Sequence, residues 1–220
     1  MLREHDTAIA LFAREPEWGR VKTRLEPELG KDGALAMHER LIRHMVSVLG
    51  NAQLARLHLF VDGDPDHPLF RDCAAELPRF RQADGHLGQR MQAASSQLLK
   101  THDRVLLIGA DCVSVDAPYL NAALQCLRGD TEVVLGPAED GGYVLLGLRR
   151  ADLQLFGAMP WGTEEVLERT RQSLRQQQLR WQELEPRWDL DRPEDLARLS
   201  SLADWPAGNK FRPGSRAVLA

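Results

Sequence analysis

The chain has 220 residues, a length that suits one large domain, and 43% of its residues are hydrophobic while 27% are charged. This composition is typical of a globular protein and excludes a disordered chain. Lys and Arg number 28 against 32 Asp and Glu, and the formal net charge of −4 does not favour nucleic acid or an anionic membrane as the main partner.

The cysteines and the N-terminal residues indicate a compartment. Cys73, Cys112 and Cys126 form an odd set without a C-x-x-C pair, so neither a disulfide framework nor a structural zinc site is expected. Cys112 has no base near it in sequence, which favours a buried, inert thiol over a nucleophile. The apolar run from Ala8 to Ala13 is too short for a signal or membrane segment. We therefore expect a cytoplasmic protein that binds neither membrane nor nucleic acid.

Apolar periodicity predicts strands that alternate with helices. In chain order, we expect strands at residues 7–13, 56–61, 104–108, 132–136 and 143–148, and helices at 31–49, 88–100, 118–128, 163–174 and 193–202. This alternation indicates an α/β fold. The last two strands are too close for a crossover helix, which predicts a mixed, mostly parallel sheet. We expect residues 1–205 to form one domain and residues 206–220 to form a flexible tail.

A basic loop follows the first predicted strand. It contains Arg14, Arg20, Lys22 and Arg24. Open α/β sheets bind ligands beyond the carboxyl ends of their strands, so cations at this place suit a phosphate ligand. The chain lacks a Walker A motif and a G-x-G-x-x-G motif, so side chains rather than a glycine cradle would hold the phosphates. A solvated basic loop is the alternative.

Three aspartates are candidate metal ligands. Asp111 directly follows a predicted strand, where it would serve as a ligand or, equally, as a turn or cap residue. In an extended segment, Asp189 and Asp191 would share one face while Leu190 points into the core, so both carboxylates could bind one divalent cation, Mg²⁺ or Mn²⁺. Asp191 could instead cap the helix that begins near Pro193.

Two further loops carry candidate binding residues. The segment at residues 136–143 contains Gly141 and Gly142, which allow backbone N–H groups to approach a ligand or simply form a hairpin turn. In the segment at residues 160–163, Trp161 would stack on a ligand or cover the core. Thr163 is well placed to cap the helix that follows.

Six ordered segments together resemble one family. They are Phe12-Ala-Arg-Glu-Pro-Glu-Trp-Gly-Arg-Val-Lys-Thr-Arg-Leu25, Gly85-His-Leu-Gly-Gln-Arg-Met91, Leu107-Ile-Gly-Ala-Asp-Cys112, Gly136-Pro-Ala-Glu-Asp-Gly-Gly-Tyr143, Pro160-Trp-Gly-Thr163 and Asp189-Leu-Asp191. Over about residues 7 to 200, the chain resembles the DUF2064 family of GT-A type transferases. That family belongs with the nucleotide-diphospho-sugar transferases and is related to the guanylyltransferases of coenzyme F420 and molybdenum-cofactor synthesis.

The resemblance implies a fold and a site. The fold would be a single-domain, Rossmann-like GT-A fold. Mg²⁺ or Mn²⁺ would be held by Asp111, Asp189 and Asp191, and the catalytic residues would be Lys22, Asp111 and Asp191. The expected nucleotide-binding residues are Ala13, Arg14, Gly19, Lys22, Arg24, Gly85, Gly88 and Arg90. The expected acceptor-binding residues are Asp140, Gly141, Gly142, Tyr143, Trp161 and Thr163.

Three functional hypotheses follow from these residues. The first is a metal-dependent transferase that moves a glycosyl group from a nucleotide-diphospho-sugar to a small acceptor. The second is a nucleotidyltransferase that joins an NTP to a phosphorylated acceptor and releases pyrophosphate. The third is a non-catalytic nucleotide-binding protein on the same fold.

Overall fold

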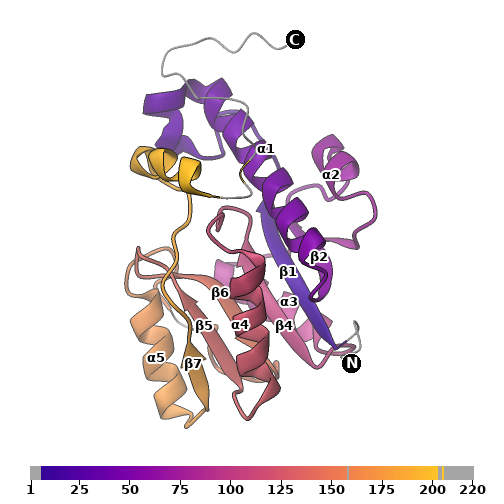
Figure 1. Cartoon of the computed structure of the whole chain (residues 1–220), viewed down its shortest axis with the longest axis vertical. Coiled ribbons are helices and arrows are strands. Elements are labelled where there is room, and N and C mark those ends of the chain that lie inside the picture. The colour runs from indigo at the N-terminus through magenta and orange to yellow at the C-terminus, as the bar shows by residue number, and fades with distance from the viewer. Residues whose placement is uncertain (1–5, 158, 203–204, 206–220) are drawn as a thin grey trace.

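A single mixed sheet lies at the centre of the molecule (Figure 1). The structure is a computed structural model, which describes residues 6–157, 159–202 and 205. The seven strands of the sheet lie in the order β3-β2-β1-β4-β6-β5-β7. Among the described strands, β6 alone runs antiparallel to its neighbours, β4 and β5. The predicted α/β fold with a mixed, mostly parallel sheet is therefore confirmed. The strands are β1 (Thr7–Arg14), β2 (Arg56–Asp62), β3 (Arg79–Arg81), β4 (Arg104–Gly109), β5 (Val133–Pro137), β6 (Tyr143–Leu148) and β7 (Trp181–Glu183).

Helices cover both faces of the sheet. The helices are α1 (Glu26–Ala52), α2 (Pro68–Cys73), α3 (Leu87–Leu98), α4 (Ala117–Arg128) and α5 (Val166–Gln176), with 3-10 helices η1 (Thr23–Leu25) and η2 (Pro193–Ser201). The prediction of helix from residue 163 was wrong by three residues at the start of α5, and the segment from 193 is a 3-10 helix rather than an α-helix. The sequence also missed the short elements α2, β3 and β7. The predicted tail at residues 206–220 lies outside the described residues.

Two apolar clusters hold these layers together. On one face, side chains of α1, α2 and α4 share a cluster with Ile9 and Leu11 of β1, and on the other, side chains of α3 and α5 share a cluster with Ala8 and Ala10 of the same strand. This alternation follows from the period of two in a strand, and a strand buried on both faces reads as one continuous apolar run. Leu190 is fully buried in the first cluster, as predicted.

The segment between β5 and β6 forms a hairpin. The N–H of Ala138 donates to the carbonyl of Gly142 at 3.0 Å, and the N–H of Leu167 in α5 donates to the carbonyl of Gly141 at 2.9 Å. Gly141 has a φ of +90°, and a Cβ there would lie 2.3 Å from the Glu164 carbonyl oxygen. Gly141 is therefore needed where the hairpin loop meets the start of α5.

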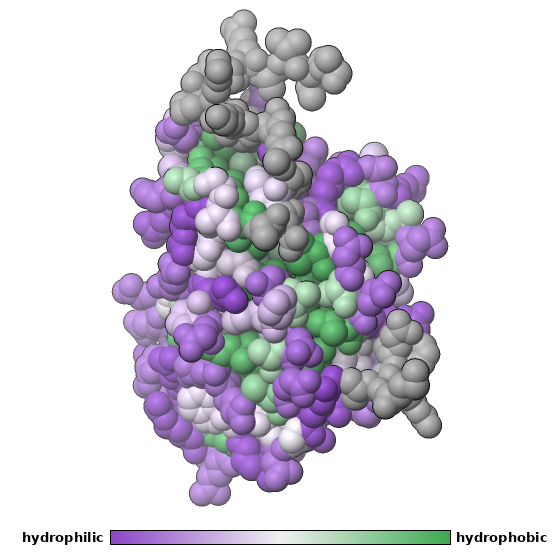
Figure 2. Space-filling model, viewed as in Figure 1, coloured by the Kyte–Doolittle hydropathy of each residue, from purple (hydrophilic) through white to green (hydrophobic). Residues whose placement is uncertain are grey.

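The surface is mostly polar on the face drawn in Figure 2, with hydrophobic residues in patches among charged ones. Within the described part of the chain, no helix combines the length and the apolar character that a membrane span requires.

Candidate functional site

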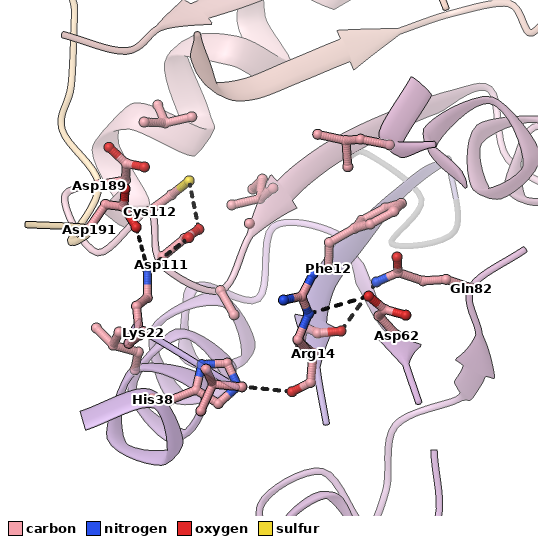
Figure 3. Close-up of a pocket in the computed structure, with 18 of the residues that line it drawn as sticks. Phe12, Arg14, Lys22, His38, Asp62, Gln82, Asp111, Cys112, Asp189 and Asp191 are labelled. Carbon is pink, nitrogen blue, oxygen red and sulfur yellow. Dashed lines mark hydrogen bonds and ion pairs between the residues drawn. The ribbon is translucent and has the colours of Figure 1, made fainter. Parts of the chain in front are cut away.

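A cavity of about 490 Å³ lies at the carboxyl ends of β1, β2 and β4 (Figure 3). It brings together segments that are distant in sequence, because the carboxyl ends of neighbouring parallel strands meet at one edge of the sheet. Nine of the predicted site residues line it: Ala13, Arg14, Lys22, Arg24, Arg90, Asp111, Tyr143, Asp189 and Asp191.

The other predicted site residues lie outside the cavity lining. Gly19 and Gly85 have φ angles of +70° and +109°, so both shape the backbone of loops beside the cavity. Among the residues predicted to bind an acceptor, only Tyr143 is part of the lining described here. The remaining six predicted residues outside the lining are Gly88, Asp140, Gly141, Gly142, Trp161 and Thr163.

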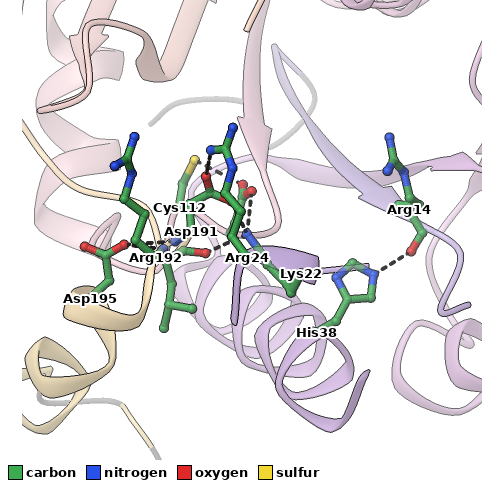
Figure 4. A network of polar contacts seen from close by, with 10 residues as sticks. Arg14, Lys22, Arg24, His38, Cys112, Asp191, Arg192 and Asp195 are labelled. Carbon is green, nitrogen blue, oxygen red and sulfur yellow. Dashed lines mark hydrogen bonds and ion pairs between the residues drawn. The ribbon is translucent and has the colours of Figure 1, made fainter. Parts of the chain in front are cut away.

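Lys22 lies at the centre of the charged end of the cavity (Figure 4). Its Nζ is 3.0 Å from Asp111 Oδ2, 3.7 Å from Asp191 Oδ1 and 2.6 Å from the carbonyl oxygen of Leu190. Its side chain is only 7% exposed. Burial opposes the ammonium, but the carboxylates of Asp111 and Asp191 outweigh it and raise the pKa of Lys22. In turn, although burial alone would raise the pKa of Asp111, the Lys22 ammonium holds it below the usual value.

Asp191 contacts cations instead of capping a helix. Its Oδ2 accepts a hydrogen bond from Nη1 of Arg24, and its Oδ1 faces Lys22. The role of cap falls to Asp195, whose Oδ2 accepts from the backbone N–H groups of Asp191 and Arg192 at 3.0 and 2.8 Å. The alternative in which Asp191 caps the helix is therefore wrong, and its carboxylate is turned toward the cavity.

Asp189 experiences excess negative charge. Burial, followed by the nearby carboxylates of Asp111 and Asp140, raises its pKa to about 7. Lys22 acts in the opposite direction but does not compensate. A carboxylate in such surroundings favours a bound proton or a bound cation.

The donor chemistry fits a hard divalent cation that shares its coordination with a ligand. Among the described residues, no group of three or more His, Cys, Asp or Glu side chains is arranged to hold a metal ion. Mg²⁺ commonly binds through one or two carboxylates and takes its other oxygens from water and substrate phosphates. Asp111 and Asp189, which both line the cavity and repel each other, supply such a pair.

The opposite wall of the cavity contains residues that the sequence analysis missed. Asp62, at the end of β2, accepts from Arg90 at 2.6 Å and from Arg14 at 3.3 Å. Burial alone would raise its pKa, but its hydrogen bond to Arg90 and the charges of Arg90 and Arg14 lower it below the usual value. The sequence contained a signal for Asp62, because this carboxylate, like that of Asp111, lies at the carboxyl end of a buried strand.

His38 and Gln82 fix the backbone at the cavity. His38 Nε2 is 2.9 Å from the carbonyl oxygen of Arg14, and burial lowers the pKa of this histidine. The side-chain amide of Gln82 donates to the carbonyls of Ala13 at 3.2 Å and Phe60 at 3.0 Å. No local motif signals either role, because both partners lie far away in sequence.

The surroundings of Cys112 match its predicted role, whereas those of Thr163 do not. Cys112 is buried, which raises the pKa of its thiol well above the usual value, as expected of an inert cysteine. Thr163 Oγ1 accepts from the N–H of Glu165 at 3.3 Å, but the helix begins after Glu165, so Thr163 is not its N-cap.

Trp161 packs on the start of α3. A Cβ at Gly88 would lie 2.4 Å from the indole ring, and the ring stacks near His86 with centroids 6.3 Å apart. It also packs against the apolar cluster beneath α3 and α5. The structure therefore supports the interpretation of Trp161 as cover for the core.

We expect Gly88→Ala to displace Trp161 and to lower the free energy of unfolding by about 1–3 kcal/mol, because the added methyl overlaps a packed ring. Denaturant unfolding measures this loss. Gly50→Ala is the matched control, since nothing lies within 4 Å of a Cβ there and the change should be neutral or stabilising. Equal stabilities of the two variants would contradict the packing of Trp161 on Gly88.

Comparison with known proteins places the chain in a family. Residues 45–163 match the family described as "Uncharacterized protein conserved in bacteria (DUF2064)". A solved structure from Desulfovibrio desulfuricans G20, provisionally named a nucleotide-diphospho-sugar transferase, is 30% identical, with a TM-score of 0.78 over 85% of this chain and 83% of that one. No curated protein matches the chain.

More distant structures share the fold. A cytidylyltransferase from Leptospira borgpetersenii is 17% identical, with a TM-score of 0.58 over 89% of this chain and 85% of that one. The 4-diphosphocytidyl-2C-methyl-D-erythritol synthase from Anaerococcus prevotii is 9% identical, with a TM-score of 0.59 over 89% and 94%. These two likenesses concern the fold alone. The family match and the 30% identical structure, in contrast, establish that the chain belongs to the DUF2064 family and has the fold of the nucleotide-diphospho-sugar transferases.

Proposed function

We propose that this protein is a metal-dependent transferase that moves a glycosyl group from a nucleotide-diphospho-sugar to a small acceptor. One observation carries the proposal: a single cavity at the carboxyl ends of β1, β2 and β4 combines cations suited to phosphates with carboxylates suited to a divalent metal. The name of the 30% identical structure supports the same class of donor. We also propose that residues 1–205 act as one transferase domain in the cytoplasm.

The cationic residues of the cavity would bind the diphosphate. Arg14 ends β1, Lys22 and Arg24 follow that strand, and Arg90 reaches the same cavity from α3. Guanidinium groups bind phosphate oxygens through paired hydrogen bonds, so the arginines would also orient the leaving group. Arg14 and Arg90 are held by Asp62, which fixes their direction before a ligand arrives.

Asp111 and Asp189, with Asp191 beside them, would hold Mg²⁺ or Mn²⁺. When bound, such a cation supplies charge that stabilises the leaving diphosphate. The acceptor would approach from the side of Tyr143, which lines the cavity at the start of β6. The hairpin loop with Asp140, Gly141 and Gly142 precedes Tyr143 and, with Trp161 and Thr163, would shape that approach.

The reaction is tested by its products. Incubation with a panel of nucleotide-diphospho-sugars and Mn²⁺, followed by chromatography, is expected to release a nucleoside diphosphate. Release of pyrophosphate from an NTP and a sugar phosphate would instead identify nucleotidyl transfer. If no nucleotide or nucleotide sugar is bound or cleaved with either metal, both reactions are rejected.

Asp189→Asn is expected to reduce this transfer by at least about a hundredfold, because loss of a metal-binding carboxylate removes several kcal/mol of charge stabilisation. Asp130→Asn is the matched control. The side chain of Asp130 is 91% exposed, and the residue precedes β5, at the opposite end of the strands from the cavity. A variant Asp189→Asn with full activity would remove this residue from the metal site.

A further inference from the structure

The ammonium of Lys22 contacts carboxylates that a metal ion in this cavity would need as ligands. Its Nζ contacts Asp111 Oδ2 at 3.0 Å and the Leu190 carbonyl at 2.6 Å, and faces Asp191 Oδ1 at 3.7 Å. These contacts join the loop after β1 to the segment before η2 (Figure 4). The positive charge of Lys22 thus neutralises the carboxylates of Asp111 and Asp191.

The backbone of Lys22 is held in an uncommon conformation. Its φ of 46° and ψ of 40° fall in the left-handed region, which a residue with a long side chain seldom adopts. Such a conformation persists where surrounding contacts over-determine it, and it is often found in segments that change conformation. The contacts of Lys22 include those of its ammonium and a hydrogen bond from the N–H of Leu25 to its carbonyl at 2.9 Å.

A divalent cation and this ammonium cannot share Asp111 without cost. Mg²⁺ binds carboxylate oxygens at about 2.1 Å, so a metal on Asp111 would lie within a few ångströms of a positive charge that is almost shielded from water. The side chain of Asp111 keeps 40% of its surface exposed, whereas that of Lys22 keeps 7%. A metal can therefore reach Asp111, but it meets an ammonium that solvent barely screens.

We infer that Lys22 exchanges partners during the binding cycle, an inference that rests on the proposed phosphate-bearing donor and metal. Without ligand, its ammonium neutralises Asp111 and Asp191 and keeps metal affinity low. Phosphates entering the cavity draw the ammonium away from Asp111, and the released carboxylate then takes the cation. Phosphate and metal consequently bind cooperatively, each stabilising the state that the other needs.

The first test uses Mn²⁺ alone, measured by calorimetry with the full chain and no nucleotide. Lys22→Met is expected to bind Mn²⁺ about tenfold to a hundredfold more tightly than the wild type, because a charge-assisted contact no longer competes for Asp111. Lys100→Met, which alters an exposed lysine after α3, is expected to match the wild type. Equal or weaker binding by Lys22→Met, or no binding by either protein, overturns the inference.

A second measurement covers the case in which Lys22→Met folds poorly. Since the metal would replace the lost cation, Mn²⁺ is expected to raise the melting temperature of Lys22→Met more than that of the wild type. A smaller rise in the variant than in the wild type overturns the inference.

Inorganic pyrophosphate tests the coupling itself. After correction for Mn²⁺ complexed by pyrophosphate in buffer, pyrophosphate is expected to tighten Mn²⁺ binding to the wild type more than to Lys22→Met. Equal tightening in both overturns the exchange of partners. None of these measurements contains a nucleotide sugar, so they are read separately from the transfer assay: failure of that assay alone rejects the glycosyl transfer and leaves the metal result standing.

Discussion

Asp189→Asn is expected to stabilise the ligand-free protein at about pH 8 by as much as about 4 kcal/mol. In the unfolded chain this carboxyl titrates near 3.8, whereas burial and the charges of Asp111 and Asp140 raise its folded pKa to about 7. Folding therefore favours the protonated form, and above the folded pKa the wild type must bury a repelled charge. Asparagine has the same shape without that charge. Urea unfolding of wild type and variant measures the difference.

The same titration gives the wild type a characteristic pH dependence. Between about pH 4 and pH 7 the folded state retains a proton on Asp189 that the unfolded state has lost, so the contribution of this group falls as pH rises and levels off above about pH 7. The difference between wild type and Asp189→Asn should therefore be small near pH 4 and largest above pH 7. A variant that is less stable than the wild type at pH 8 would show that the carboxylate is favourably paired.

Asp191→Asn is the matched control, because it lies one residue beyond Leu190 and faces Lys22 and Arg24 instead of other carboxylates. Its replacement removes favourable charge contacts, so its effect on stability is expected to have the opposite sign to that of Asp189→Asn. Effects of the same sign would contradict this difference in surroundings.

Asp111→Asn is expected to destabilise the ligand-free protein by about 2 kcal/mol at neutral pH, the value of a charge-assisted hydrogen bond. The change leaves the buried Lys22 ammonium without its nearest carboxylate. Removing one partner of a fully buried ion pair costs more, about 3–5 kcal/mol, but the side chain of Asp111 is 40% exposed and water screens part of the loss. Guanidinium unfolding provides the measurement.

The control for Asp111→Asn is Asp130→Asn, whose side chain is 91% exposed and should change stability by less than about 0.5 kcal/mol. If both variants match the wild type, the contact between Lys22 and Asp111 is not maintained in solution, and the proposed exchange of partners would lose its starting state.

The sequence by itself determined the main strands and several site residues. Buried parallel strands need apolar side chains on both faces, so β1 and β4 appear in the sequence as continuous apolar runs. The ends of these runs predicted the position of site residues that follow them, such as Asp111. The period of two in extended backbone likewise placed Leu190 in the core and the aspartates beside it toward the other face. These inferences depend on local geometry, which sequence spacing encodes.

Only the tertiary structure decided which of these residues meet. The contact between Lys22 and the Leu190 carbonyl spans 168 residues, and the pairing of Arg24 with Asp191 replaces the helix cap that local sequence made plausible. β3 and β7 have three residues each and are set by pairing with β2 and β5 rather than by a pattern of their own. Contacts of this kind depend on the order of strands in the sheet, and that order is fixed by packing over the whole chain, which no local periodicity records.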